Sequence, residues 1–151
     1  MKRPPRKTDE GLFTRQILAI SLLQGIIVLA IVLVVYVLAL ANGFSETQTR
    51  TLTFTTIVVA NLSLILTNRS WSGTILSTMR IPNKALWWVV TGTIACLLLV
   101  LYVPTLQALF LFGAVPPPAI LLSAVAGITS IAWFEIYKYV INGRTSIDPA
   151  R

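Results

Sequence analysis

Four long apolar stretches alternate with shorter polar connections along the chain, and they cover residues 17–41, 51–67, 85–102 and 119–139. An α-helix needs roughly 20 apolar residues to cross the hydrocarbon core of a bilayer. The first stretch exceeds that length, whereas the second barely reaches it and is the most polar of the four, rich in Ser and Thr. Small polar residues in a membrane helix favour contact with other helices over contact with lipid. The pattern predicts an all-α integral membrane protein, a four-helix transmembrane bundle.

Helix-breaking residues fall where the stretches end. Asn42-Gly43 follows the first stretch, and this pair is typical of a helix end. Pro104 follows the third, and a proline there stops the helix that precedes it. The run 116–118 is Pro-Pro-Pro and leads into the fourth stretch, where proline is tolerated in the first helical turn. These signals predict four separate helices.

The connections differ in length and character. We expect a short outer loop that holds Ser45, Glu46 and Arg50. We expect a longer cytoplasmic connection whose residues 72–80 form a short helix at the membrane surface, because its apolar side chains recur at helical spacing. Residues 105–117 are uncharged and partly apolar, which predicts a segment in the outer interface.

The basic residues are sorted to one side of the predicted membrane. Of the 12 Lys and Arg, five precede the first stretch, three lie between the second and third, and three follow the fourth. Arg50 alone lies in a connection of the opposite parity. Cytoplasmic flanks of membrane helices carry an excess of Lys and Arg. Both termini are therefore predicted to be cytoplasmic, and we expect a multi-pass protein of the plasma membrane.

This topology predicts three regions: a basic leader over 1–16, a membrane domain over 17–140 and a cytoplasmic tail over 141–151. The chain is 56% hydrophobic and only 11% charged, with a mean hydropathy of +0.81. A net charge of +7 suggests an anionic partner. Because the charge flanks membrane helices, that partner is predicted to be lipid, and no nucleic acid is expected.

Several kinds of chemistry have no residues to support them. The sequence has no His, which excludes histidine metal sites and histidine bases. Its one cysteine, Cys96, cannot form an internal disulfide and is expected to be a small packing residue. The sequence contains no Gly-rich phosphate loop. We expect no cofactor in this chain, no catalytic residue and no enzymatic activity of the chain alone.

Asn61, near the middle of the second stretch, is the foremost candidate for a functional residue. Polar groups at that depth usually face the interior of a bundle. Asn61 is therefore either a neutral oxygen ligand on a cation path or a partner in an interhelical hydrogen bond. The residues alone favour the hydrogen bond.

The other polar residues of the predicted spans suit structural roles. Glu135 is the only acidic residue in a span, but it lies near the cytoplasmic end with Lys138 at i+3. We expect an interfacial ion pair that anchors the fourth helix, rather than a functional carboxylate. Gln24 lies in the first span and is expected to bind a neighbouring helix rather than a ligand.

Five blocks of this sequence resemble the C-terminal membrane domain of type II P-type cation-transporting ATPases. The opening Met-Lys-Arg-Pro-Pro-Arg, which includes Arg3 and Arg6, resembles the cytoplasmic loop before the seventh membrane helix of that family. Further blocks in the family's order and spacing are Phe54-Thr55-Thr56, Asn61 with Asn68-Arg69-Ser70, Leu101-Tyr102-Val103-Pro104 with Leu106-Gln107 and Phe110, and Trp133-Phe134-Glu135 with Lys138.

The resemblance implies that the four spans are helices seven to ten of a ten-helix pump. In that family the eighth helix can supply a cation ligand, often Glu or Gln, and Asn61 matches that position. The implied partners are the N-terminal remainder of the pump (helices one to six and the cytoplasmic domains), membrane lipid and the transported cation. The phosphorylated Asp and its Asp-Lys-Thr-Gly surroundings do not occur in this sequence. Mg-ATP is therefore implied for the complete pump only.

A stand-alone four-helix membrane scaffold or small transporter subunit is the alternative function. A carrier coupled to protons or cations needs a carboxylate near the middle of the membrane, and none is predicted there. A scaffold has no such requirement. The polar second helix favours a partner, since unpaired polar groups facing lipid are costly.

Overall fold

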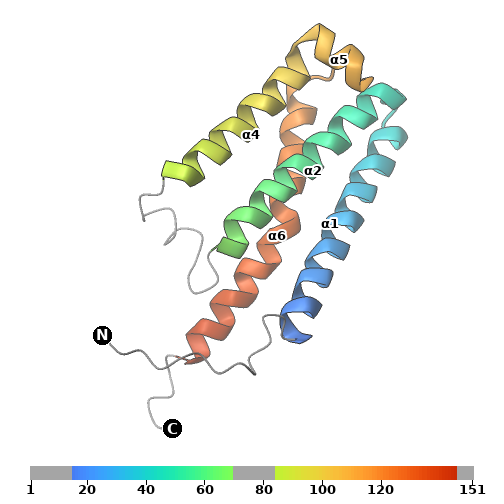
Figure 1. Cartoon of the computed structure of the whole chain (residues 1–151). Helices are drawn as coiled ribbons and strands as arrows, with labels where there is room; N and C mark the ends of the chain where they lie inside the picture. The colour runs from blue at the N-terminus through green and yellow to red at the C-terminus, as the bar shows by residue number, and fades with distance from the viewer. Residues whose placement is uncertain (1–14, 70–83, 146–151) are drawn as a thin grey trace.

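The computed structural model describes residues 15–69 and 84–145, and this part of the chain is helical apart from short connections. Its helices are α1 (Arg15–Ala41), α2 (Glu46–Arg69), α4 (Lys84–Tyr102), α5 (Pro104–Phe110) and α6 (Pro117–Thr145). They form an elongated bundle (Figure 1). Within the described ranges, α1, α2, α4 and α6 are long and apolar enough to cross a membrane. The predicted all-α fold with four spans is confirmed.

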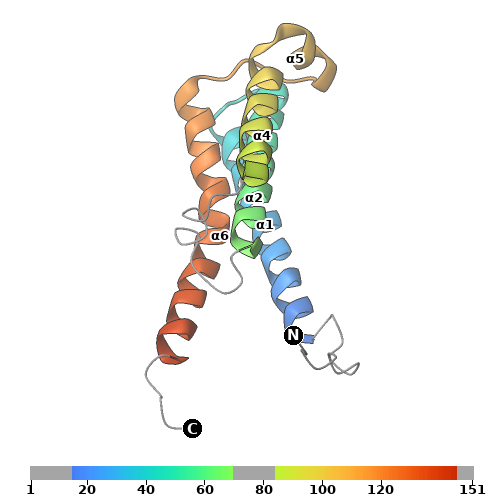
Figure 2. The ribbon, with the colours of Figure 1, turned by 60° about the vertical axis from the view of Figure 1, so that its left-hand side comes forward.

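Helix α2 lies at the centre of the bundle. It packs most extensively on α6, next on α1, and only over a short stretch on α4. Figure 2 shows α6 and α4 apart from each other, with α5 beyond the end of α4 and the segment after α5 running across to α6. The prediction that the polar second span is buried among helices is confirmed at four of its threonines, Thr51, Thr55, Thr56 and Thr67, and Thr49, just before the predicted span, is buried as well.

The ends of the helices agree with the distribution of basic residues. Helix α1 begins and helix α6 ends at the same end of the bundle, and the α1–α2 connection and α5 lie at the other end (Figure 1). The distribution of Lys and Arg predicts that the end where α1 begins and α6 ends is the cytoplasmic end. We therefore call the end that holds the α1–α2 connection and α5 the outer end.

The α1–α2 connection is shorter than we expected from the sequence. Gly43 takes a left-handed conformation (φ 81°), and the Phe44 amide donates to the Ala39 carbonyl at 3.2 Å, as in a Schellman helix end. Helix α2 then begins at once. Ser45 Oγ accepts from the Gln48 amide at 3.3 Å, and the Ser45 amide donates to Gln48 Oε1 at 3.0 Å. This reciprocal capping box fixes the start of the helix at residue 46.

The predicted outer loop with Glu46 and Arg50 is therefore wrong, because both residues lie in the first turns of α2. The span that we placed at 51–67 is the middle of a longer helix. The reason is physical: hydropathy detects the apolar part of a helix, whereas its polar first turns are set by capping.

The later connections also contain more helix than predicted. The segment 105–117 includes most of α5, whose first residue is Pro104, so this proline both ends α4 and begins the next helix. Residues 111–116 then connect α5 to α6. Helix α6 continues to Thr145, so the predicted tail at 141–151 begins with helix rather than with irregular chain.

Two predictions lie outside the described residues. These are the basic leader, with Arg3 and Arg6, and the surface helix at 72–80.

Candidate functional site

Helix α2 has two faces of different character. Thr49, Leu52, Thr56 and Ala60 recur at spacings of three and four residues and are all buried. Thr67, two turns further along, is buried as well. Residues at this spacing share one side of a helix. This side, which we call the packing face, contacts the rest of the bundle.

Small residues bring the packing face close to α6. A Cβ placed on Gly127 of α6 would lie 2.8 Å from the carbonyl oxygen of Thr56 and 3.1 Å from the amide nitrogen of Ala60. Thr56 Oγ1 donates to the Ser123 carbonyl of α6 at 3.2 Å. Close approach through small residues, with hydroxyl groups bonded across the interface, is the usual way in which membrane helices associate. The packing face is therefore an interface that is complete within this chain.

The other face of α2 carries Arg50, Phe54, Ile57 and Asn61, again at spacings of four, three and four residues. We call this side the open face. Arg50 and Phe54 are partly exposed, and Ile57 and Asn61 are exposed. The same spacing continues to Ile65, which is also exposed. The open face is thus left uncovered by the described helices from Ile57 to Ile65, whereas Phe54 contacts Phe110 and Phe112.

Asn61 lies on the open face, about two-thirds of the way along α2 from its outer end. We expected it to face the interior of the bundle, but the interior formed by the described helices does not include it. No hydrogen bond joins its amide to any other group in the described part of the chain, so the interhelical bond that we considered is not formed there. An amide has an acceptor oxygen that suits a cation and donors that suit water.

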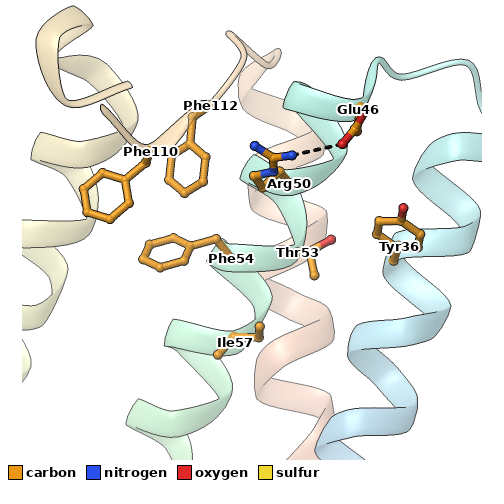
Figure 3. Close-up of a pocket in the computed structure, with 8 residues that line it drawn as sticks. All are labelled: Tyr36, Glu46, Arg50, Thr53, Phe54, Ile57, Phe110 and Phe112. Atoms are coloured by element: carbon orange, nitrogen blue, oxygen red, sulfur yellow. Dashed lines mark hydrogen bonds and ion pairs between the residues drawn. The ribbon is translucent and has the colours of Figure 1, made fainter. Parts of the chain in front are cut away.

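The outer end of the open face carries an ion pair. Arg50 Nη2 donates to Glu46 Oε1 at 3.0 Å, and the two side chains are 41% and 76% exposed. Figure 3 shows the pair at the rim of an open pocket of about 420 Å³. Phe54, Phe110 and Phe112 line the side of this pocket away from α1, with ring centroids 5.1–6.2 Å apart.

The connection from α5 to α6 is fastened to the first turns of α2, which shapes the pocket. Thr51 Oγ1 donates to the Gly113 carbonyl at 3.0 Å, and the Gly113 amide donates to both the Thr47 carbonyl and Thr51 Oγ1, each at 3.1 Å. Gln48 Nε2 donates to the Ala114 carbonyl at 2.8 Å. These bonds hold Phe112 over α2.

Gln24 lies between α1 and α2 near their cytoplasmic ends. Its side chain is only 3% exposed, and Nε2 donates to Asn68 Oδ1 of α2 at 3.4 Å. Helices α1 and α2 are thus joined by a polar contact at a distance at which hydrogen bonds are weak.

The remaining candidates are described only in part. Glu135 and Lys138 lie in α6, but their side chains are outside the described part, so the predicted ion pair stays a prediction. Cys96 is exposed on α4. Among the residues that the structure describes, no group of three or more His, Cys, Asp or Glu side chains could hold a metal ion. A cation on the open face would need ligands from elsewhere in addition to Asn61.

Sequence reasoning did not identify the Glu46–Arg50 pair or the three phenylalanines as a group. The i,i+4 spacing of Glu46 and Arg50 was the available signal, since opposite charges at that spacing meet on a helix. The phenylalanines come from α2, from α5 and from the segment after α5. Only the tertiary structure brings them together.

The family model described as "Cation transporting ATPase, C-terminus" matches residues 1–140. The match extends over α1, α2, α4 and α5 and most of α6. No curated protein matches the chain.

Proposed function

Since the chain belongs to the family of C-terminal domains of cation-transporting ATPases, we propose that the open face of α2 lines the cation path of a complete pump, with Asn61 as a ligand or lining group. The chain is an integral membrane domain, and the rest of the pump is its partner. Family membership favours this function over the stand-alone scaffold or small transporter subunit.

The observation that supports the proposal best is the position of Asn61. Its amide is exposed well inside a membrane helix, about two-thirds of the way along α2 from the outer end, and makes no hydrogen bond within the described part of the chain. A polar group left in hydrocarbon is costly, so such groups face protein or a hydrated path. Helices of the remaining pump, packed on the open face, would enclose Asn61 together with their own ligands.

The sequence supports a proposed division of roles between this domain and the rest of the pump. The 151 residues contain no Asp-Lys-Thr-Gly motif and no phosphate-binding loop. Binding of Mg-ATP and phosphorylation therefore belong to the N-terminal remainder, and this domain has no ATPase activity alone. Its own contribution is to support the transport helices and to supply Asn61.

The lipid-facing surface and the location of the pump belong to the same proposal. Large apolar side chains are exposed along α1 and α4, including Leu29, Val37 and Leu98. Acyl chains cover those surfaces in the membrane. The excess of cytoplasmic Lys and Arg supports contact with anionic headgroups, and the pump acts in the plasma membrane.

The test replaces Asn61 in the complete pump and measures the cytoplasmic cation concentration that half-saturates ATP hydrolysis. A first screen with Ca²⁺, Mn²⁺, Na⁺ and K⁺ identifies the activating cation. Asn61→Leu should raise the half-saturating concentration about tenfold, the effect of one lost ligand worth about 1.4 kcal/mol. Asn61→Gln, which keeps the amide, should be affected less.

The matched controls are Ile57→Leu, on the same open face, and Glu135→Gln. Both should change the half-saturating concentration less than about twofold, within the scatter of substitutions that remove no ligand. Equal effects of Asn61→Leu and Glu135→Gln, or no effect of Asn61→Leu, would reject Asn61 as a ligand.

A further inference from the structure

The two charged side chains that the topology places at the outer end of the chain are paired with each other on the open face. Arg50 is the one basic residue outside the cytoplasmic set, and Glu46 is the one acidic residue of the outer connection and its flanking turns. Their ion pair measures 3.0 Å. Exposed pairs of this kind contribute little to stability. Their position therefore calls for an explanation other than holding the helix together.

The pair lies in line with Asn61. After Arg50, the residues Phe54, Ile57 and Asn61 follow on the same face of α2 at spacings of four, three and four residues. At a rise of ~1.5 Å per residue, Arg50 is roughly 16 Å from Asn61 along the axis of α2. A charge at the outer end of this face therefore acts electrostatically on any cation held beside Asn61. The packing face does not lie between them, because both are on the open face.

The pocket beside the pair is open and of a size to hold water. It measures about 420 Å³, and Figure 3 shows Glu46 and Arg50 at its rim with Phe54 and Ile57 further along α2. The segment that closes its far side is fastened to α2 by the bonds of Thr51 and Gln48. An open, partly charged pocket at the outer end of a cation path has the features of a vestibule.

We propose that this pocket is the outer vestibule of the cation path and that the Glu46–Arg50 pair sets the affinity for the cation on the outer side. The inference rests on the proposed function, because it takes the open face to line the path. As a neutral pair, the two charges nearly cancel at the distance of Asn61. Arg50 thereby prevents Glu46 from retaining a cation that is leaving.

The proposal predicts effects of opposite sign for the two charges. Arg50→Gln leaves the Glu46 carboxylate unpaired and strengthens outer-side binding. Glu46→Gln leaves the Arg50 guanidinium unpaired and weakens binding of the cation on the outer side. At an effective dielectric constant of about 20 and at low ionic strength, where screening is weak, one unit charge at roughly 16 Å changes affinity by up to about fivefold. The double substitution Glu46→Gln/Arg50→Gln restores neutrality and should lie close to the unsubstituted pump.

The experiment uses the complete pump in sealed inside-out vesicles, whose lumen corresponds to the outer side. The activating cation from the screen above is loaded into the lumen at increasing concentration, and the initial rate of ATP-driven uptake is measured. Arg50→Gln should lower the half-inhibiting luminal concentration about fivefold, and Glu46→Gln should raise it about fivefold. If both single substitutions shift the half-inhibiting concentration in the same direction, the pair has a merely structural role and the proposal is overturned. The proposal is also overturned if the double substitution shifts that concentration further in one direction than either single substitution does.

The two proposals fail in different measurements. Asn61→Leu is judged by the cytoplasmic half-saturating concentration, and the charge series is judged by the luminal half-inhibiting concentration. If Asn61→Leu has no effect while the charge series shifts in opposite directions, the role of Asn61 is rejected and the vestibule stands. If Asn61→Leu acts as expected while the charge series does not shift, the vestibule alone is rejected.

Discussion

Gly127 of α6 lies so close to Thr56 of α2 that a Cβ on the glycine would stand 2.8 Å from the threonine carbonyl oxygen. The atoms around this contact are largely backbone, so they cannot move aside as the end of a flexible side chain would. The tight crossing of α2 and α6 therefore depends on the absence of a side chain at one position.

Gly127→Ala should lower the free energy of unfolding of the chain by about 1–3 kcal/mol, the usual cost of overpacking. The measurement is SDS-induced unfolding of the chain in detergent micelles, followed by circular dichroism. Gly92→Ala on α4 is the matched control, because nothing lies within 4 Å of its added Cβ. That control should be neutral or stabilising by up to about 1 kcal/mol. Equal destabilisation by both would contradict the close crossing.

Thr51→Val should release the connection between α5 and α6 from α2. The valine keeps the shape of the side chain but loses the hydroxyl that donates to the Gly113 carbonyl and accepts from the Gly113 amide. We expect a loss of about 1–2 kcal/mol and faster hydrogen exchange of the Gly113 amide. Thr93→Val is the control, since that hydroxyl bonds only to its own helix. Unchanged exchange at Gly113 would show that other contacts hold the segment.

Gln24 and Asn68 should show a small coupling energy in a double-mutant cycle of Gln24→Leu and Asn68→Ala. Polar pairs between membrane helices average about 0.6 kcal/mol, and a separation of 3.4 Å places this pair at or below that value. The free energy of unfolding in micelles is measured for the unsubstituted chain, each single variant and the double variant. A cycle of Gln24→Leu with Thr93→Val, which do not contact each other, should be additive. Additivity of Gln24→Leu with Asn68→Ala would show that the contact carries no energy.

A spin label on Cys96, the single cysteine of the chain, should report a hydrocarbon environment. Cys96 is exposed in the middle of α4. In liposomes, the label should collide more often with oxygen, which dissolves in lipid, than with a water-soluble nickel chelate. The control carries Cys96→Ala and a label at Asn42→Cys in the α1–α2 connection, where the preference should reverse. A preference for the nickel chelate at Cys96 would contradict a membrane-spanning α4.

The spans followed from the sequence, and their orientation is predicted from it, because both inferences depend on averages over many residues. Long apolar runs correctly predicted α1, α4 and α6, and the sorting of Lys and Arg predicts which end is cytoplasmic. The family resemblance from the short blocks around Asn61 and Trp133 is confirmed by the match over residues 1–140. None of these inferences needed to know which helix contacts which.

Features that depend on a single partner did not follow from the sequence. The true start of α2 rests on the Ser45–Gln48 capping box, which hydropathy does not detect. Gly127 has nothing in its own helix to mark it as the point of closest approach. Whether Asn61 faces inward or outward depends on the rotation of α2 about its axis, and the packing of α6 against the opposite face determines that rotation.

The central position of α2 has a consequence for the biogenesis of the domain. Its mean hydropathy of 1.4 is the lowest of the four spans, against 2.9 for α1. A segment of low hydropathy partitions poorly from the translocon into lipid when it is alone. We expect α1 to enter first and α2 to follow as the second arm of a hairpin, with the close α1–α2 turn keeping the two arms together. The helix that organises the finished bundle would thus be the one that most depends on its neighbour to reach the membrane.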